Sequence, residues 1–322
     1  MSIGAQAYTE LIASTREALD TQELVDNVIT QHPLLEIFKD NARSYTGRAV
    51  QVNIEGAENG STTFTDDSGS FSTGIDSDLV GTALYDWSAP MVTKTRLAFK
   101  TIEMNQGKEQ IVDLVKTHLK AAEKGHAKTL AQALYDATPA VGAPLSLPVL
   151  VNGGNVVGGI DGSVKGYWNS LRMTYGTAYP AKAAFRDTLN QLFIYGDGSR
   201  PTHILCGVDV YEKYESQLDE AARAMMTANP TTIDGRFREL KFDGLTVRLD
   251  PDCPANEAYF LNKDDIVFGY LADNWMKVQP AQQVPGTLDY VTPIASVVVV
   301  GLRQRRSHAR IDFADPGSGS GS

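Results

Sequence analysis

GKEQIVDLVKTHLKAAEKGHAKTLAQALY, residues 107–135, decides the fold of this chain. The stretch contains no proline, and residues that favour helices dominate it. Its apolar residues recur every three or four positions, which is the spacing of one helix face: Ile111, Leu114, Val115, Leu119, Ala122, Leu130 and Leu134. At 1.5 Å per residue such a helix is about 43 Å long, well above the usual length. The sequence therefore predicts one very long helix around which the rest of the chain is organised.

Two strands are predicted before this helix, with a long polar loop between them. Residues 48–55 alternate polar and apolar side chains, as a half-buried strand does, and a return strand passes through Leu84, Tyr85 and Trp87. The loop between them, GSTTFTDDSGSFSTGIDSDLVGT at 60–82, has four aspartates, no lysine or arginine, and few large apolar residues. It cannot bury enough surface to fold by itself. The loop therefore needs contacts outside itself if it is to be ordered.

The remaining predicted helices and strands segregate along the chain and do not alternate regularly. Pro33 opens a short helix, PLLEIFKDN, as proline does at a first helical position. Further helices are expected at 181–194 and 208–218, and strands at 202–206, 240–249, 258–261, 266–271 and 295–311. This order predicts an α+β fold.

Composition limits the kinds of partner. The chain has 322 residues, 42% of them hydrophobic, which is enough for one large or two modest domains. Its formal net charge of −10 repels nucleic acid and anionic lipid, so any contact with DNA must be local. No apolar run approaches the roughly 20 residues that span a bilayer, and we expect no membrane partner. The two cysteines, Cys206 and Cys253, are expected to be reduced, buried and inert.

The sequence offers no convincing catalytic or metal site. His118 and His126, eight residues apart on the long helix, are expected to be surface or packing residues. NGGNVVGGIDGS lacks the lysine that follows a phosphate-binding loop. Asp250 and Asp252, in DPDCP, are the best candidates for a hydrolase, but turn formation explains them better. We therefore expect no cofactor, no metal and no enzymatic activity.

Basic residues form one stripe on the long helix. Its members, four residues apart, are Lys116, Lys120, Lys124 and Lys128. The first explanation is a solvated face, partly offset by Glu123, and the second is a face turned toward a polyanion. Another basic group is weaker, because strand alternation would divide it between two faces; it comprises Arg303, Arg305, Arg306 and Arg310.

Several sequence segments, taken in their order along the chain, resemble one known family. They are ALYDWS followed by EMNQGKEQIVDLV, then VVGGIDGSVKGYWNS, RPTHILCGVDVYEKYES, FDGLTVRLDPDCPANEAYFLNKDDIVF and VVVVGLRQRRSHARIDF. From about Pro33 to Phe313 the chain resembles the major capsid proteins of tailed bacteriophages, which have the Hong Kong 97-type fold. No single segment is a catalytic signature motif, and the resemblance rests on the order of the segments.

The resemblance implies a division of the chain into five regions. These are an N-terminal arm at 1–43, an extended loop (E-loop) at 44–93, a peripheral domain at 94–202 and 300–313 with its spine helix at 107–135, an axial domain at 203–299, and a flexible tail at 314–322. The axial domain would meet its copies around hexamer and pentamer axes.

By the same resemblance, the E-loop lies across an adjacent subunit, which would give the polar loop its order. Its expected contact residues are Phe64, Asp66, Asp67, Phe71, Ile75 and Asp78. In the protein that gives the fold its name, a lysine on this loop forms an isopeptide bond with an asparagine of a neighbour. Residues 44–92 contain no lysine, so we expect no such cross-link and a shell held by non-covalent contacts.

The implied function is an icosahedral shell, assembled in the host bacterial cytoplasm, that encloses packaged double-stranded DNA in the virion. The implied partners are further copies of the chain in hexamers and pentamers, a portal protein, a decoration protein, and DNA held by weak non-specific contact. About 32 residues precede Pro33, too few for a fused scaffolding region, so a separate scaffolding protein is expected. The alternatives are an encapsulin-type compartment shell, which has the same fold, and an intracellular hydrolase.

Overall fold

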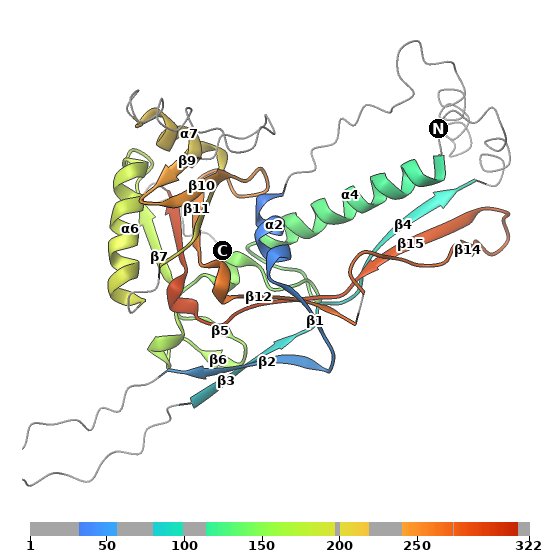
Figure 1. Ribbon diagram of the computed structural model, residues 1–322, viewed down its shortest axis with the longest axis horizontal. Coiled ribbons are helices and arrows are strands. Elements are labelled where there is room, and N and C mark those ends of the chain that lie inside the picture. Colours follow the sequence, from blue (N-terminus) through green and yellow to red (C-terminus); the bar gives the residue numbers. More distant parts are fainter. Residues whose placement is uncertain are drawn as a thin grey trace, which may run out of the picture.

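The computed structural model describes residues 32–56, 80–98, 114–196, 200–218, 240–272 and 274–314. Figure 1 shows the long helix α4 (Leu114–Leu134) extending away from a sheet that is covered by two other helices. Strands and helices occupy separate parts of the molecule, as the α+β prediction requires. The predicted long helix is confirmed from residue 114 onward, and residues 107–113 lie outside the described part of the chain.

Among the described residues, the largest sheet has six strands. Their order across the sheet is β7 (Leu171–Tyr175), β17 (Ala309–Phe313), β11 (Glu257–Leu261), β8 (His203–Cys206), β10 (Leu245–Leu249) and β9 (Leu240–Phe242). Strands β8 and β10 are parallel, as are β7 and β17, whereas β11 is antiparallel to both of its neighbours. The sheet is therefore mixed, and its central strands come from distant parts of the sequence.

Two helices, α6 (Ala181–Tyr195) and α7 (Val208–Ser216), pack on one face of this sheet. The buried side of α6 follows the helical period and includes Ala181, Ala184, Phe185, Thr188 and Leu192. At the centre of this layer, the Phe185 ring lies 5.2 Å from the Tyr214 ring and 5.5 Å from the Phe260 ring. These aromatic contacts hold the two helices to the sheet and to each other.

The helix predicted to begin at Pro33 is α2 (Pro33–Asp40), and it is docked against the body of the protein. Its Phe38 ring lies 5.4 Å from Phe268 in β12 (Ile266–Leu271), and β12 is the middle strand of a second sheet, β1–β12–β16. Strand β1 (Ala42–Tyr45) follows α2 directly, and β16 is Val298–Leu302. The part of the arm from residue 32 onward is thus integrated into the core.

Asp250 supplies the polar partner that the start of α2 lacks locally. The His32 side chain makes no capping hydrogen bond, but the Asp250 carboxylate accepts one from the Leu34 backbone N–H at 3.1 Å. It also accepts hydrogen bonds from the Tyr135 hydroxyl at 3.0 Å and from the Asp252 N–H at 3.0 Å. A negative group at a helix N-terminus is favourable. One buried side chain therefore joins α2, the end of α4 and the turn after β10.

Helix α4 lies on a third sheet, in which β4 (Met91–Leu97) pairs with β15 (Tyr290–Ser296). Two short strands, β13 (Lys277–Val278) and β14 (Gln282–Gln283), pair with the other edge of β15. His126 is fully buried between helix and sheet, with its ring nitrogens 2.9 Å from Thr93 Oγ1 and 2.8 Å from Ser296 Oγ. Burial lowers the pKa of His126. The expectation that this histidine is a packing residue is confirmed.

Two of the predicted strands are wrong in extent. Residues 240–249 form a hairpin, β9 and β10, because Asp243 and Gly244 both adopt positive φ angles, of 49° and 83°, in the turn between them. The run predicted at 295–311 is divided into the end of β15, then β16, a 3₁₀ turn η3 (Arg305–Ser307) and β17. The pattern of apolar residues indicates that this segment is buried, but it does not indicate where the chain leaves one sheet and enters another.

The sheets also divide the chain differently from the expected domain boundaries. Strands β7 and β17, placed in the peripheral region, belong to the same sheet as the axial strands β8, β10 and β11. Strands β12 and β15, placed in the axial region, pair instead with β1 and β4. Strand pairing therefore crosses the expected boundaries at 202 and 299, because strands that are distant in sequence share a sheet.

Candidate functional site

The predicted loop lies between the two strands of a hairpin at the edge of the body, next to β5 (Val156–Val157) and β6 (Ile160–Asp161) (Figure 1). Strand β2 (Ala49–Glu55) pairs antiparallel with β3 (Val80–Asp86), from Ala49 opposite Asp86 to Glu55 opposite Val80. Burial alternates along both strands, so one face of the hairpin lies on the body and the other is exposed. Both strands were expected and both are confirmed, except that Trp87 lies one residue beyond the end of β3.

On the inner face of β3, side-chain size falls toward the end of the hairpin: Tyr85, then Ala83, then Gly81. Tyr85 is fully buried, and its hydroxyl donates to the Leu302 carbonyl at 2.7 Å and accepts from the Leu302 N–H at 3.1 Å. Burial raises the pKa of Tyr85 to about 12. The base of the hairpin is thus fixed to β16.

Beyond Tyr85, the hairpin rests on residues 150–169, which we call the cradle. The cradle contains β5 (Val156–Val157), β6 (Ile160–Asp161) and the 3₁₀ turn η1 (Gly166–Trp168). The Leu84 N–H donates to the Gly158 carbonyl at 2.9 Å. Gly158 has a φ of +62°, and a Cβ there would lie 2.8 Å from the Ala83 Cβ, so only glycine suits both the turn and the close approach.

At the outer end of the described hairpin, Tyr167 fills the space beneath two glycines. A Cβ on Gly56 would overlap the Tyr167 ring. A Cβ on Gly81 would lie 3.4 Å from the Tyr167 hydroxyl oxygen and 3.6 Å from Ile160 Cδ1, in ordinary contact. The cradle therefore touches β3 at successive inward positions and reaches the last described residue of the segment that contains β2.

Arg305 holds the cradle from inside the protein. Its guanidinium donates to the carbonyls of Leu150 at 3.0 Å, Trp168 at 2.6 Å and Asn152 at 2.6 Å, and to Asn155 Oδ1 at 2.7 Å. Burial lowers the pKa of Arg305 to about 10, which leaves the group charged at neutral pH. The expectation that this arginine lies within a long strand is wrong, because it lies in a 3₁₀ turn and is fully buried.

The expected contact residues of the loop lie outside the described residues. They are Phe64, Asp66, Asp67, Phe71, Ile75 and Asp78. The outer face of the described hairpin is mixed: Val80 is 67% exposed and Leu84 is 53% exposed, beside the exposed polar residues Gln51, Asn53 and Thr82.

The lysine stripe is partly described. Lys120 and Lys128 are exposed, and Lys124 is half-buried and takes part in an interaction. The Lys116 side chain lies outside the described part of the chain. Lys124 and Lys128 are each two residues from the buried His126, which places them about 160° around the helix from it. These two lysines thus lie on the face of α4 that is turned away from β4 and β15.

The residues considered for catalysis have structural partners. Asp250 is buried in the network that joins α2 to α4, and burial raises its pKa. Asp252 Oδ2 lies 2.6 Å from His32 Nδ1. Both cysteines are free and buried, as expected, and burial raises the pKa of each thiol. Within the described ranges, no group of three metal-ligating side chains comes together, and no helix is long and apolar enough to cross a membrane.

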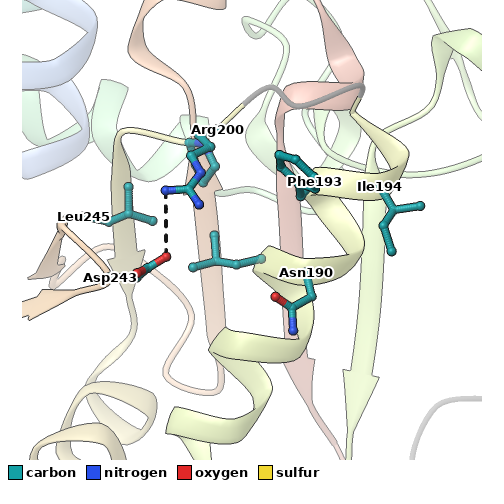
Figure 2. Close-up of a pocket in the computed structure, with 8 residues that line it drawn as sticks. Asn190, Phe193, Ile194, Arg200, Asp243 and Leu245 are labelled. Atoms are coloured by element: carbon teal, nitrogen blue, oxygen red, sulfur yellow. Dashed lines mark ion pairs between the residues drawn. The ribbon is translucent and has the colours of Figure 1, made fainter.

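A hollow of about 480 Å³ lies between α6 and the β9–β10 turn (Figure 2). It is lined by Leu189, Asn190, Phe193, Ile194, Arg200, Pro201, Asp243 and Leu245. Arg200 and Asp243 face each other across it, with 3.9 Å between Nη1 and Oδ2, and both side chains are largely exposed. The eight described residues that line the hollow include no histidine, cysteine or serine.

Sequence reasoning missed the residues that support the hairpin, namely Tyr167, Gly158 and Arg305. Two signals were available. The pair Gly158–Gly159 between apolar residues is typical of a tight hairpin turn. The small residues Gly81 and Ala83 alternate on one face of a strand, which indicates close approach of another part of the protein.

The fold is the Hong Kong 97-type capsid fold. The capsid of cyanophage A-1(L) matches with a TM-score of 0.61 and 14% identity, over 93% of this chain and 97% of that one. The capsid of an empty GTA particle matches with a TM-score of 0.63 and 12% identity, over 92% of this chain and 95% of that one. An encapsulin complex of Synechococcus elongatus matches with a TM-score of 0.57 and 8% identity, over 100% of this chain and 98% of that one. No protein-family model and no curated protein matches the sequence.

Proposed function

We propose that this chain is the major capsid protein of a tailed bacteriophage. Its copies would assemble as hexamers and pentamers into the icosahedral shell of the virion, around packaged double-stranded DNA. The observation that supports this best is the fold match to the cyanophage A-1(L) capsid, which covers more than nine-tenths of both chains. Its role is structural, and the candidate carboxylates Asp250 and Asp252 serve the packing of α2 and α4.

The shape of the subunit suits assembly through many modest contacts. The β2–β3 hairpin lies along the edge of the body and exposes Val80 and Leu84 on its outer face. An exposed hairpin on each copy can meet a neighbour, and repeated weak contacts act together once a lattice closes. In this proposal the loop between the two strands contacts the adjacent subunit through Phe64, Asp66, Asp67, Phe71, Ile75 and Asp78.

The partners beyond the chain itself also belong to this proposal. A separate scaffolding protein, a portal protein and a decoration protein would act in assembly, which takes place in the host cytoplasm. Packaged DNA would meet the exposed lysines of α4, Lys120 and Lys128, by weak non-specific contact. The acidic chain suits DNA that is pumped into a finished shell, since condensation on DNA needs a basic coat.

The proposed domains follow the sheets. The axial domain is the six-stranded sheet with α6 and α7, which brings β7 and β17 together with β8 to β11. The peripheral domain is α4 with β4 and β15. The E-loop is the β2–β3 hairpin and the residues between its strands.

Assembly of the purified full-length chain tests the proposal. We expect closed particles in negative-stain electron micrographs and a mass in the megadalton range, or ring-shaped capsomers of several hundred kilodaltons, by light scattering. A small oligomer that never forms capsomers or closed particles at any concentration contradicts it.

A second candidate is the shell of an encapsulin-type compartment, which the likeness to the Synechococcus elongatus encapsulin complex favours. The two functions differ in what the particle holds. Particles from the native source should contain nuclease-protected double-stranded DNA if the chain is a capsid protein. Particles filled with a cargo enzyme and free of DNA support the compartment.

Deletion of residues 62–73 tests the loop separately. The hairpin register from Ala49 to Glu55 does not involve these residues, so the subunit should keep its circular dichroism spectrum and unfold cooperatively. We expect that it no longer closes shells. Stable particles of normal size from this deletion contradict the assigned role of the loop.

A further inference from the structure

We propose that the cradle, residues 150–169, sets the direction in which the hairpin leaves the subunit, with Tyr167 as the contact point and Arg305 as the residue that positions it. The proposal rests on the capsid function above and adds a mechanism to it. A hairpin that must meet a neighbour needs a defined exit angle, and the described contacts fix that angle within one subunit.

The first step of the argument is the graded inner face of β3. Tyr85, Ala83 and Gly81 are consecutive inward positions, and the body contacts the strand at each of them. At Ala83 the approaching group is Gly158, and at Gly81 it is Tyr167. A hairpin supported at three successive positions on one face cannot tilt without breaking contacts.

The second step concerns the two glycines above Tyr167. Gly56 follows β2 and Gly81 lies in β3, so one ring supports both sides of the hairpin where the described strands end. Glycine weakens a strand, and its presence is explained where another group comes close. The ring position therefore determines how near the hairpin can lie to the body.

The third step is the origin of the ring position. Tyr167 lies in η1, between Gly166 and Trp168, and the Trp168 carbonyl accepts a hydrogen bond from Arg305 at 2.6 Å. The Trp168 indole N–H donates to the Val157 carbonyl at 2.8 Å, which joins η1 to β5. All four acceptors of the Arg305 guanidinium lie in the cradle. Arg305 precedes β17, so the cradle is tied to the large sheet.

The sharpest test adds one methyl group, as Gly56→Ala. Its Cβ would overlap the Tyr167 ring, so the hairpin or the ring must move. The matched control is Gly166→Ala, which adds the same methyl next to Tyr167 at a position with no neighbour within 4 Å. Hydrogen exchange on the full-length chain, in its smallest soluble form, reports the hairpin without requiring shells.

We expect the amides of β2 and β3 to exchange about tenfold or more faster in Gly56→Ala, with β8 and β11 unchanged. Gly166→Ala should match the wild type. In a protein that already carries Tyr167→Ala, Gly56→Ala should raise the exchange rates of the hairpin amides only slightly further, because the ring that the new methyl group would meet is absent. Arg305→Lys should also speed exchange in the hairpin, since one ammonium cannot replace the planar guanidinium donors.

Assembly is the second readout. Gly56→Ala and Arg305→Lys should give particles of altered diameter or open sheets, while Gly166→Ala gives particles of wild-type diameter. The proposal is overturned if Gly56→Ala has the amide exchange rates and the particle diameter of the wild type. It is also overturned if Gly56→Ala speeds exchange equally in the presence and in the absence of the Tyr167 ring. If even the wild type forms no particles, the capsid function fails, and the exchange measurements still decide whether the cradle orients the hairpin.

Discussion

His308 should make the stability of the fold fall as the solution becomes acidic. Its ring is fully buried next to β17, and Nδ1 accepts a hydrogen bond from the Asn262 N–H at 3.2 Å. Burial, with a smaller contribution from the Arg305 charge, lowers the pKa of His308 to about 3 from its ordinary 6.5. The folded protein therefore keeps this ring neutral over a pH range in which the unfolded chain protonates it.

The sign and size of the effect follow from this difference. Above pH 6.5 the ring is neutral in both states and contributes no pH dependence. Below pH 6.5 the unfolded chain binds a proton that the folded protein does not bind until about pH 3. Each pH unit in that window lowers the free energy of unfolding by about 1.4 kcal/mol, and the whole window by about 5 kcal/mol.

The assay compares urea unfolding of the wild type and of His308→Asn at about pH 7 and about pH 5. The Asn carbonyl oxygen can still accept from the Asn262 N–H, and the side chain does not titrate. Between these two pH values, the wild type should lose about 2 kcal/mol more than the variant. Burial raises the pKa of Asp250 and of Glu257, which stabilises the fold as the pH falls, but this contribution is common to both proteins.

Val247→Ala is the control, because it removes buried methyl groups in β10 and changes no titrating group. It should lower the free energy of unfolding by a similar amount at both pH values. Equal pH dependence in the wild type and in His308→Asn would refute the assignment of this acid sensitivity to His308.

Three further predictions concern other parts of the molecule. Asp250→Ala should lower the free energy of unfolding by roughly 3 to 5 kcal/mol in urea titrations, since it leaves two backbone donors and the Tyr135 hydroxyl without their buried acceptor. Phe185→Ala should cost about 3 to 5 kcal/mol in the same assay, because its ring meets three other rings beneath α6. Substitution of Lys120 and Lys128 by Gln should leave thermal unfolding and particle size unchanged and should reduce the amount of DNA retained per particle. A DNA content equal to that of the wild type would count against a DNA-facing α4.

Local patterns in the sequence predict the elements whose neighbours are close in sequence or whose period is clear. The long helix, the strands of the hairpin and α6 follow directly from the spacing of apolar residues. The turn at Asp243–Gly244 was predictable as well, because this dipeptide between apolar residues favours a two-residue hairpin loop. It was hidden within a run that reads as one strand when only hydrophobicity is counted.

The remaining features depend on partners that are distant in sequence. A buried Arg305 cannot be told from a surface arginine by local pattern, since the carbonyls that satisfy it lie between 137 and 155 residues away. The same applies to Asp250, which completes a helix 216 residues earlier. The loop contacts remain a prediction, because the structure describes neither those residues nor a neighbouring subunit.

The central strands of the six-stranded sheet separate two hydrophobic cores and give the subunit its rigidity. In β8, Ile204 and Cys206 face the core beneath α6, while Leu205 faces the core that holds α2 and the base of the hairpin. Strand β11 alternates in the same way, with Phe260 on one side and Tyr259 on the other. A sheet buried on both faces resists bending, since any tilt of its strands disturbs the packing of two cores at once. The cradle is tied through Arg305 to this sheet, so the packing of both cores opposes a change in the direction of the hairpin.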